Sequence, residues 1–162
     1  MSYEYMIGVR VNSGSFYLSF YYGYDTIMTV VRGMDTRNIN VITLAYLGDA
    51  IYEVYIREYL IRSGIAKVDS LQKEAVKYVS AKSQCKILNC LIDNGVLTDN
   101  EIEIVKRGRN YSRDSHPKNT DIITYKMSTG FETLLGYLYL EDKERLDKII
   151  NYILEEYDEK NS

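Results

Sequence analysis

The sequence predicts an all-α fold, a single helical domain that spans residues 34–162. Apolar residues recur three and four positions apart in successive segments after Met34, as they do on the buried face of a helix. No segment in this range alternates convincingly between apolar and polar residues, as a half-buried strand would. The chain of 162 residues is long enough for one domain with a hydrophobic core and short for two.

The composition excludes several classes of protein. Hydrophobic residues make up 46% and charged residues 27%, which is ordinary for a globular protein. No apolar run reaches the ~18 residues that a membrane-spanning helix needs, so we expect no membrane partner. Two cysteines, Cys85 and Cys90, and a single histidine, His116, exclude a disulfide framework and disfavour a structural zinc site. A cytoplasmic location fits this composition best.

Residues 1–33 follow a different pattern from the rest of the chain. They hold six of the 17 tyrosines and four of the ten glycines, with short β-prone runs and no helical periodicity. This N-terminal extension is either a genuine appended segment, structured or disordered, or upstream sequence included because the start was set too early. The abrupt change of pattern at Met34 favours the second interpretation.

The first two predicted helices lie between residues 38 and 80. The first runs from about Asn38 to Arg62 and stops near Gly64. The second opens at Asp69, which we expect to act as the N-cap, with Gln72 three residues later completing a capping box.

Four further segments follow. A helix runs from about Ser80 to Gly95 and carries its apolar residues on one face. Thr98 and Glu101 form another capping box, which opens a helix that ends near Gly108. The remaining segments are a polar loop with the only proline and two more helices, at 109–120, 121–140 and 143–157.

One carboxylate, Asp49, interrupts an apolar helix in the segment LAYLGDAIYE, residues 44–53. Burial of an ionised carboxylate is unfavourable unless a cation or hydrogen bonds compensate it. Gly48 costs about 1 kcal/mol relative to alanine inside a helix, so we expect another backbone, or a second copy of the helix, to approach closely there. The alternative is an aspartate on a narrow polar strip, paired with arginine or lysine.

A second carboxylate, Glu132, has similar surroundings in STGFETLLGYLYL, residues 128–140, where Gly130 and Gly136 flank it. Taken singly, each acid is most simply a residue of the helix surface. Two such helices packed together would bring Asp49 and Glu132 to one pocket. That pocket would suit Mg²⁺, which prefers oxygen ligands and water. Such a site hydrolyses phosphodiesters by activating water and shielding the charge that builds up at phosphorus.

The segment 106–126 is basic in an acidic protein. It carries six lysines and arginines and two aspartates, a local charge of +4, whereas the whole chain has a net charge of −3. A basic segment on an acidic body is an electrostatic footprint for a polyanion. The alternative is a solvated loop without a partner.

Five segments occur together in a characteristic order and spacing: LAYLGDAIYE, VSAKSQCKIL, KRGRN, PKNTD and STGFETLLGYLYLE. They resemble Mini-ribonuclease III, the small bacterial relatives of ribonuclease III that lack its double-stranded-RNA-binding domain. The resemblance covers residues 34–162. It implies a ribonuclease III-like endonuclease domain that forms a homodimer and cleaves double-stranded RNA with Mg²⁺. Family members mature the ends of 23S ribosomal RNA.

The resemblance also implies roles for particular residues. Asp49 and Glu132 match the catalytic, metal-binding acids of the two family motifs. Larger ribonuclease III enzymes carry two further metal-binding acids, four residues before the first and three before the second. This chain has Ala45 and Thr129 there, a reduction that Mini-ribonucleases share and that leaves the number of metal ions open.

The resemblance makes the basic segment an RNA-binding surface. Basic side chains can contact phosphates and the amides can reach sugar hydroxyls or phosphates, since A-form RNA is recognised largely by shape, phosphates and 2′-hydroxyls. The candidate RNA-binding residues are Lys82, Lys86, Arg107, Arg109, Asn110, Lys118 and Asn119.

Several alternatives stay open at this stage. A non-catalytic protein that binds structured RNA with the same fold is the first, because two family acids are missing. A helical protein-interaction module that uses the acidic C-terminal helix is the second. Assistance by a ribosomal protein is a further open question. Four tyrosines of the first helix could stack on bases, but at helical spacing we expect them to pack in the core or a dimer; they are Tyr46, Tyr52, Tyr55 and Tyr59.

Overall fold

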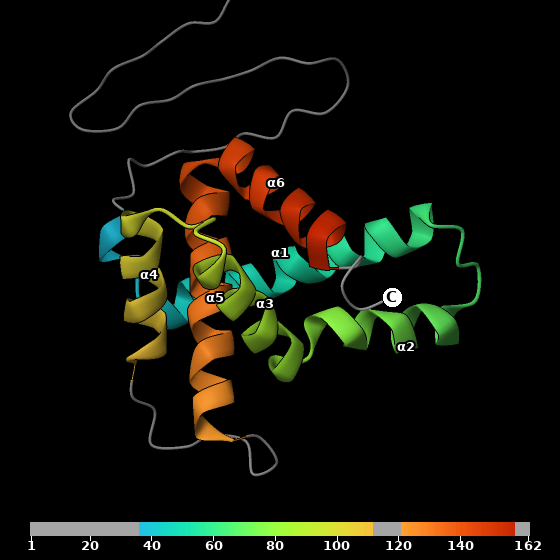
Figure 1. Ribbon diagram of the computed structural model, residues 1–162, viewed down its shortest axis with the longest axis horizontal. Helices are drawn as coiled ribbons and strands as arrows, with labels where there is room; N and C mark the ends of the chain where they lie inside the picture. The colour runs from blue at the N-terminus through green and yellow to red at the C-terminus, as the bar shows by residue number, and fades with distance from the viewer. Residues whose placement is uncertain (1–35, 112–120, 158–162) are drawn as a thin grey trace, which may run out of the picture. The chain divides into compact units, whose positions relative to one another are not determined.

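The computed structural model describes residues 36–111 and 121–157, and these residues form an all-helical domain without strands, as predicted (Figure 1). The described residues from Ile39 onward belong to one compact unit. The elements are η1 (Thr36–Asn38), α1 (Val41–Arg62), α2 (Val68–Val79), α3 (Ala81–Asp93), α4 (Asp99–Arg109), α5 (Ile122–Glu141), α6 (Lys143–Tyr152) and the π-helical turn η2 (Ile153–Tyr157).

Side-chain caps start most of these helices. Thr98 and Glu101 form the predicted capping box of α4: the Thr98 amide donates to Glu101 at 2.8 Å and the Glu101 amide donates to Thr98 at 3.3 Å. Asp121 caps α5 by accepting from the Thr124 amide at 2.9 Å. Each cap satisfies amides that the first helical turn leaves without partners.

The predicted capping box at Asp69 is wrong. The N-cap of α2 is Lys67, whose side chain makes no capping hydrogen bond, and Asp69 lies inside the first turn. The helix begins earlier because the Lys67 carbonyl already accepts from the Leu71 amide, at 2.9 Å. In this position the Asp69 charge still favours the helix N-terminus, through the dipole.

Two predicted helix ends also need correction. The first helix begins at Val41, because Asn40 caps it by accepting from the Ile42 amide at 2.9 Å. The last helix changes to a π-helical turn after Tyr152.

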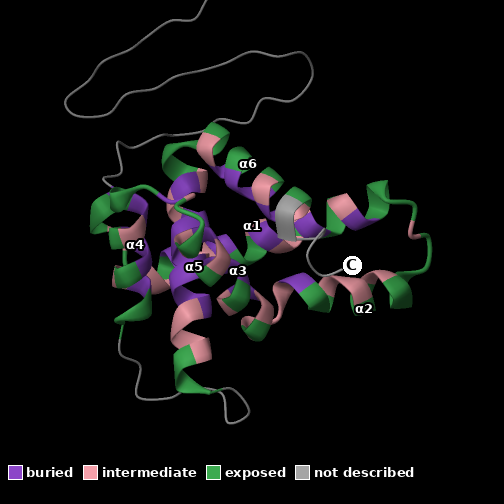
Figure 2. Cartoon of the chain, in the orientation of Figure 1, coloured by how far each residue is buried: buried purple, intermediate pink, exposed green. Residues whose placement is uncertain are grey.

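Helix α5 is the centre of the domain and packs against α1, α3, α4 and α6 (Figure 1). Its middle is buried, as the purple band along it shows (Figure 2). Phe131 is fully buried in this band and meets Tyr52 of α1 edge to face, with ring centroids 5.0 Å apart. Because α5 is covered on several sides, it holds few positions where a charged side chain can reach solvent.

Two glycines set the crossing of α1 and α5. A Cβ atom at Gly48 would lie 1.9 Å from the carbonyl oxygen of Glu132, and one at Gly136 would lie 2.0 Å from that of Leu44. The backbones therefore touch directly. Of the two approaches that the sequence left open for Gly48, the structure shows another backbone of the same chain. A second copy of the helix is not needed to explain this glycine.

A second close contact joins α4 to α5. A Cβ atom at Gly108 would lie 2.4 Å from the hydroxyl oxygen of Thr133, and one at Gly130 would lie 2.9 Å from the Val105 carbonyl oxygen. The Gly130 that flanks Glu132 in the sequence therefore serves the α4 contact, while Gly136 serves the α1 contact. Together the two crossings fix the rotation of α5 about its axis.

A buried ion pair ties α4 to α6. Glu101 is buried, and its carboxylate accepts from Arg145 at 2.7 and 2.9 Å, while the same guanidinium donates to the Val96 carbonyl at 2.7 Å. Burial alone would raise the pKa of Glu101, but the hydrogen bonds from Arg145 and Thr98 outweigh it and hold that pKa below its usual value.

None of the helices in the described ranges is long and apolar enough to cross a membrane.

Candidate active site

The two acids singled out by the sequence, Asp49 and Glu132, line one cavity of about 360 Å³. Its walls come from α1, α3 and α5, with the last residue of α2. The lining residues are Ile42, Ala45, Tyr46, Asp49, Val79, Ala81, Gln84, Tyr125, Ser128, Thr129 and Glu132. Among these described residues there are two carboxylates and no lysine, arginine or histidine, so the cavity carries uncompensated negative charge at neutral pH.

The glycine crossing explains why the acids share this cavity. Because the backbone at Gly48 touches the backbone at Glu132, the residue after Gly48 comes close to the glutamate. Asp49 is exposed and Glu132 is half-buried. Of the two interpretations that the sequence left open for Asp49, the buried acid is therefore wrong: Asp49 lies on the solvent side of α1, and the apolar residues Tyr46 and Val54 are exposed with it.

The polar-strip alternative for Asp49 predicted a basic partner. No ion pair joins Asp49 to a lysine or arginine within the part of the chain that the structure describes. The next acid along α1 is Glu53, which forms an ion pair with Arg57 instead.

Both carboxylates of the cavity have raised pKa values. Burial, and then the neighbouring charge of Asp49, raise the pKa of Glu132 to about 7, although the Gln84 side chain acts in the opposite direction. Burial and the charge of Glu53 raise the pKa of Asp49. A bound cation would reverse these effects, because it favours the ionised form of each acid.

The donor set fits a hard cation that keeps much of its water. Carboxylate oxygens from Asp49 and Glu132 are ligands that Mg²⁺ accepts, and Mg²⁺ is commonly held by one or two carboxylates with waters completing its shell. No cluster of three acid, cysteine or histidine side chains occurs in the described ranges. A site with these two acids would leave most coordination positions to water and substrate.

The positions of the two missing family acids also line the cavity. Ala45 and Thr129 are both buried there, one turn before Asp49 and Glu132 respectively. The Thr129 hydroxyl donates to the Tyr125 carbonyl at 3.0 Å, so the hydroxyl hydrogen is engaged within α5 and does not donate into the cavity. These two side chains leave space at the cavity wall without adding charge.

The cavity contains one residue that the analysis of the sequence missed. Gln84 of α3 lies beside Glu132 and is only 1% exposed. Its sole sequence signal was membership of the segment VSAKSQCKIL, since periodicity alone marks position 84 as a core residue. The packing of α3 against α5, rather than the local pattern, brings this amide to the acids.

None of the candidate RNA-binding residues that the structure describes lines the cavity. Lys82 and Lys86 are exposed on α3, Arg109 and Asn110 are exposed at the end of α4, and Arg107 is half-buried there. Basic residues at a helix C-terminus also interact favourably with the helix dipole, which is a purely structural reason for their position. Lys118 and Asn119 lie outside the described residues, as does His116.

The tyrosines of α1 divide into two groups. Tyr52 is buried and Tyr55 and Tyr59 are half-buried, as expected for packing residues. Tyr46 is 82% exposed and lines the acidic cavity, so it does not belong to the core.

Comparisons with known proteins agree with this arrangement. The ribonuclease III domain family matches residues 42–143. Mini-ribonuclease 3 of Streptococcus pneumoniae is 46% identical over 123 residues, which cover 75% of this chain and 96% of that relative. The enzyme of the same name from Enterococcus faecalis is 44% identical over 128 residues, covering 78% and 97%. The chain belongs to the Mini-ribonuclease 3 family.

A solved structure supports the same fold. The crystal structure of a Fusobacterium nucleatum protein superposes with a TM-score of 0.66 at 32% identity and covers 76% of this chain and 98% of its own. As a Mini-ribonuclease 3, the chain is a ribonuclease III-type endoribonuclease, and RNA is its class of substrate. The family is generally dependent on divalent metal ions.

Proposed function

We propose that this Mini-ribonuclease 3 cleaves double-stranded RNA with Mg²⁺ held by Asp49 and Glu132. The observation that carries the proposal is the shared cavity. Its two carboxylates have raised pKa values, and no basic residue is among the described residues that line it. A cation resolves this electrostatic conflict, and a hard cation suits the oxygen donors. Asp49 and Glu132 are then the catalytic acids.

The protein side chains have distinct tasks in this mechanism. Mg²⁺, when bound, activates a water as the nucleophile and shields the charge that builds up at phosphorus. Glu132 must be ionised to hold the metal, and its pKa of about 7 makes its proton a competitor of the metal near neutral pH. Asp49, on the exposed side of the cavity, is the acid nearer to an approaching strand.

We propose the exposed basic residues as the surface that holds the duplex. Those that the structure describes lie outside the cavity, as expected for groups that contact phosphates away from the scissile bond, since phosphate contacts mainly position a nucleic acid. The described residues are Lys82, Lys86, Arg109 and Asn110, which are exposed, and Arg107, which is half-buried. Lys118 and Asn119, which lie outside the described residues, complete the proposed surface. A chain without a separate RNA-binding domain would depend on such contacts, so its affinity would be strongly salt-sensitive.

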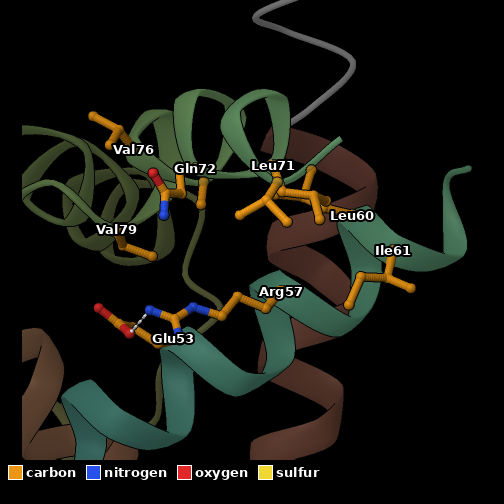
Figure 3. Close-up of a pocket in the computed structure, with 10 residues that line it drawn as sticks. Glu53, Arg57, Leu60, Ile61, Leu71, Gln72, Val76 and Val79 are labelled. Carbon is orange, nitrogen blue, oxygen red and sulfur yellow. Dashed lines mark hydrogen bonds and ion pairs between the residues drawn. The ribbon is translucent and has the colours of Figure 1, made fainter. Parts of the chain in front are cut away.

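We propose a homodimer whose interface includes the groove between α1 and α2. This groove has a volume of about 440 Å³ and mostly apolar walls, with the Glu53–Arg57 ion pair beside it (Figure 3). Three apolar side chains that line it are largely exposed: Ile61 by 60%, Val68 by 65% and Val76 by 58%. A clustered exposed apolar patch indicates an interaction surface. A symmetric pair would present two cavities, one for each strand of a duplex.

The remaining features of the proposal come from the family. We propose the ends of precursor 23S ribosomal RNA as the substrate and the cytoplasm as the location. Assistance by a ribosomal protein is a further element of this proposal. The assignment of residues 34–162 as the catalytic domain and of 1–33 as an extension also stays a prediction. Mass spectrometry of the natively expressed protein tests it, and a peptide from residues 1–33 would contradict a start at Met34.

The deciding experiment compares the wild-type protein with Asp49→Asn on a structured duplex RNA, with and without Mg²⁺. We expect metal-dependent cleavage by the wild type, leaving 5′-phosphate and 3′-hydroxyl ends, and none by the variant. Asp93→Asn is the matched control, because Asp93 is an exposed aspartate of α3 outside the cavity. Equal cleavage by wild type and Asp49→Asn would show that Asp49 is not a catalytic ligand.

The second candidate function is binding of structured RNA without cleavage. The observation behind it is that Ala45 and Thr129 stand in the cavity wall at positions where larger ribonuclease III enzymes carry acids. A mobility shift of the duplex without any cleavage in millimolar Mg²⁺ or Mn²⁺ would support this function over the nuclease.

A further inference from the structure

A buried amide in the acidic cavity lacks a hydrogen-bond partner. Gln84 is 1% exposed, lines the cavity, and its Nε2 atom forms no hydrogen bond of ordinary geometry with any described residue. The Gln84 side chain acts on the neighbouring Glu132 carboxylate as a hydrogen-bonding group does and lowers its pKa, but the distance and angles between the two groups fall outside those of an ordinary hydrogen bond. The great majority of buried polar side-chain atoms in proteins have at least one partner.

This unsatisfied donor is unfavourable in the free protein. A buried donor without a partner destabilises the folded protein, and an apolar side chain of similar shape would avoid that cost. Gln84 lies in the first turn of α3, where Ser80 already accepts hydrogen bonds from the backbone. The backbone N–H of Gln84 donates to the Ser80 carbonyl at 2.9 Å, and the backbone N–H of Ser83 donates to the Ser80 hydroxyl at 3.4 Å. The side chain of Gln84 therefore has no role in capping its own helix.

The chemistry of the cavity shows what an amide can do there that a lysine or arginine cannot. A cationic side chain beside Asp49 and Glu132 would form an ion pair with them and compete with a metal ion for their oxygens. A neutral amide donates a hydrogen bond without neutralising either carboxylate. It suits an acceptor oxygen that must sit close to a metal held by those acids, and a phosphate oxygen of RNA is such an acceptor.

We propose that the side-chain amide of Gln84 donates a hydrogen bond to a phosphate oxygen of the RNA strand that enters the cavity. The inference rests on the proposed function and adds a substrate-binding residue to it. The acids hold the metal, and the exposed basic residues bind the duplex outside the cavity. Gln84 positions the phosphate beside the two acids. The same donor could alternatively serve a metal-bound water, which the test separates.

The test uses the full-length chain with Gln84→Leu, which removes the donor and keeps an apolar side chain of similar size. Asn89→Leu is the matched control, since Asn89 is an exposed amide of the same helix outside the cavity. Three quantities are measured: the melting temperature, the affinity for a short duplex RNA in Ca²⁺ with cleavage monitored on gels, and the affinity for Ca²⁺ alone. Ca²⁺ offers a hard cation with looser geometry than Mg²⁺.

We expect Gln84→Leu to melt no lower than the wild type, because an unsatisfied donor has been removed, and to bind the duplex about tenfold more weakly. Its affinity for Ca²⁺ alone should stay within twofold of the wild type, and Asn89→Leu should match the wild type in RNA and Ca²⁺ affinity. Gln84→Glu replaces the donor by a third carboxylate, so it should bind Ca²⁺ more tightly and the duplex more weakly than Gln84→Leu in the absence of divalent ions.

Three results would overturn the proposal. Duplex affinity unchanged in Gln84→Leu would show that the amide does not contact RNA. A large drop in melting temperature, or failure to fold, would show that the amide is satisfied inside the free protein and is structural. Weaker binding of Ca²⁺ alone would assign the donor to metal-bound water instead. If wild type neither binds nor cleaves the duplex, the proposed function itself is wrong, whereas the first result with an active wild type refutes Gln84 alone.

Discussion

The raised pKa of Glu132 makes a prediction that runs against the usual effect of mutating an active-site residue: Glu132→Gln should stabilise the metal-free protein. In the unfolded chain this carboxyl titrates near 4.5, and in the fold near 7, because of burial and of the charge on Asp49. The folded state thus holds the proton more tightly. The stability that this tighter proton binding by Glu132 contributes is fully present below pH 4.5 and is lost as the pH rises through 7.

The size of the effect follows from the same values. A rise of the pKa from 4.5 to about 7 corresponds to roughly 3 kcal/mol at most, and the partial exposure of Glu132 reduces this to about 1–3 kcal/mol. Glutamine has nearly the same shape and no charge. At pH 8 in EDTA, Glu132→Gln should therefore unfold with a free energy about 1–3 kcal/mol higher than the wild type, and at pH 4 the difference should nearly vanish.

Urea denaturation at both pH values, at one protein concentration, measures this difference. Glu155→Gln is the control, because Glu155 is an exposed glutamate away from the cavity; it should change little at either pH. Added Mg²⁺ should stabilise the wild type at pH 8 and have less effect on Glu132→Gln. A Glu132→Gln protein that is less stable than the wild type at pH 8 in EDTA would refute the electrostatic reasoning.

The remaining predictions concern the scaffold and the RNA surface. Gly48→Ala should lower the free energy of unfolding by several kcal/mol in thermal melts, because its Cβ would overlap a backbone carbonyl at 1.9 Å. The control, Gly95→Ala, lies at φ 65° with open space around it and should lower the free energy of unfolding by only about 1–2 kcal/mol. Equal effects of the two substitutions would show that Gly48 is not needed for the close crossing of α1 and α5. Glu101→Gln should destabilise the protein by about 3 kcal/mol at pH 7 by breaking the buried pair with Arg145. Because the pKa of Glu101 is lowered by folding, this difference should shrink only as the pH falls through that lowered value; chemical denaturation from pH 7 to pH 3 checks it. Arg109→Ala should reduce the slope of log K against log salt for duplex binding by about 0.9, as one lost phosphate contact does, and an unchanged slope would remove Arg109 from the RNA surface.

The fold was largely predictable because its signals are local. Helical periodicity and short-range caps place most helices within a few residues, and the Thr98–Glu101 box is confirmed in detail. The box at Asp69 failed for an equally local reason: the same sequence signature is compatible with a helix that has already begun, and the hydrogen bond to Lys67 decides where it starts. The family resemblance was also predictable, because it depends on the identity and order of residues in five short segments and not on the three-dimensional structure.

The candidate site was predictable only in part. Periodicity could not decide between a buried Asp49 and one on a narrow polar strip, and the structure exposes Asp49 and buries more of Glu132. The difference arises because periodicity reports which face of a helix is apolar, and α1 keeps several apolar residues exposed beside the acid. The presence of Gln84 at the acids has no local signature at all.

By itself, the sequence determined that the chain is helical, where its helices lie, which family it belongs to, and that two acids stand next to glycines in apolar helices. Only the tertiary structure decided that these acids share a cavity without basic neighbours, that Glu132 titrates near 7, and that an unsatisfied amide joins them from α3. The physical reason is that the cavity arises where α1 and α3 both pack on α5, and the contact of Gly48 with the backbone of α5 brings the two acids together there. That contact joins residues more than 80 positions apart, and it sets the desolvation and charge proximity on which the chemistry depends.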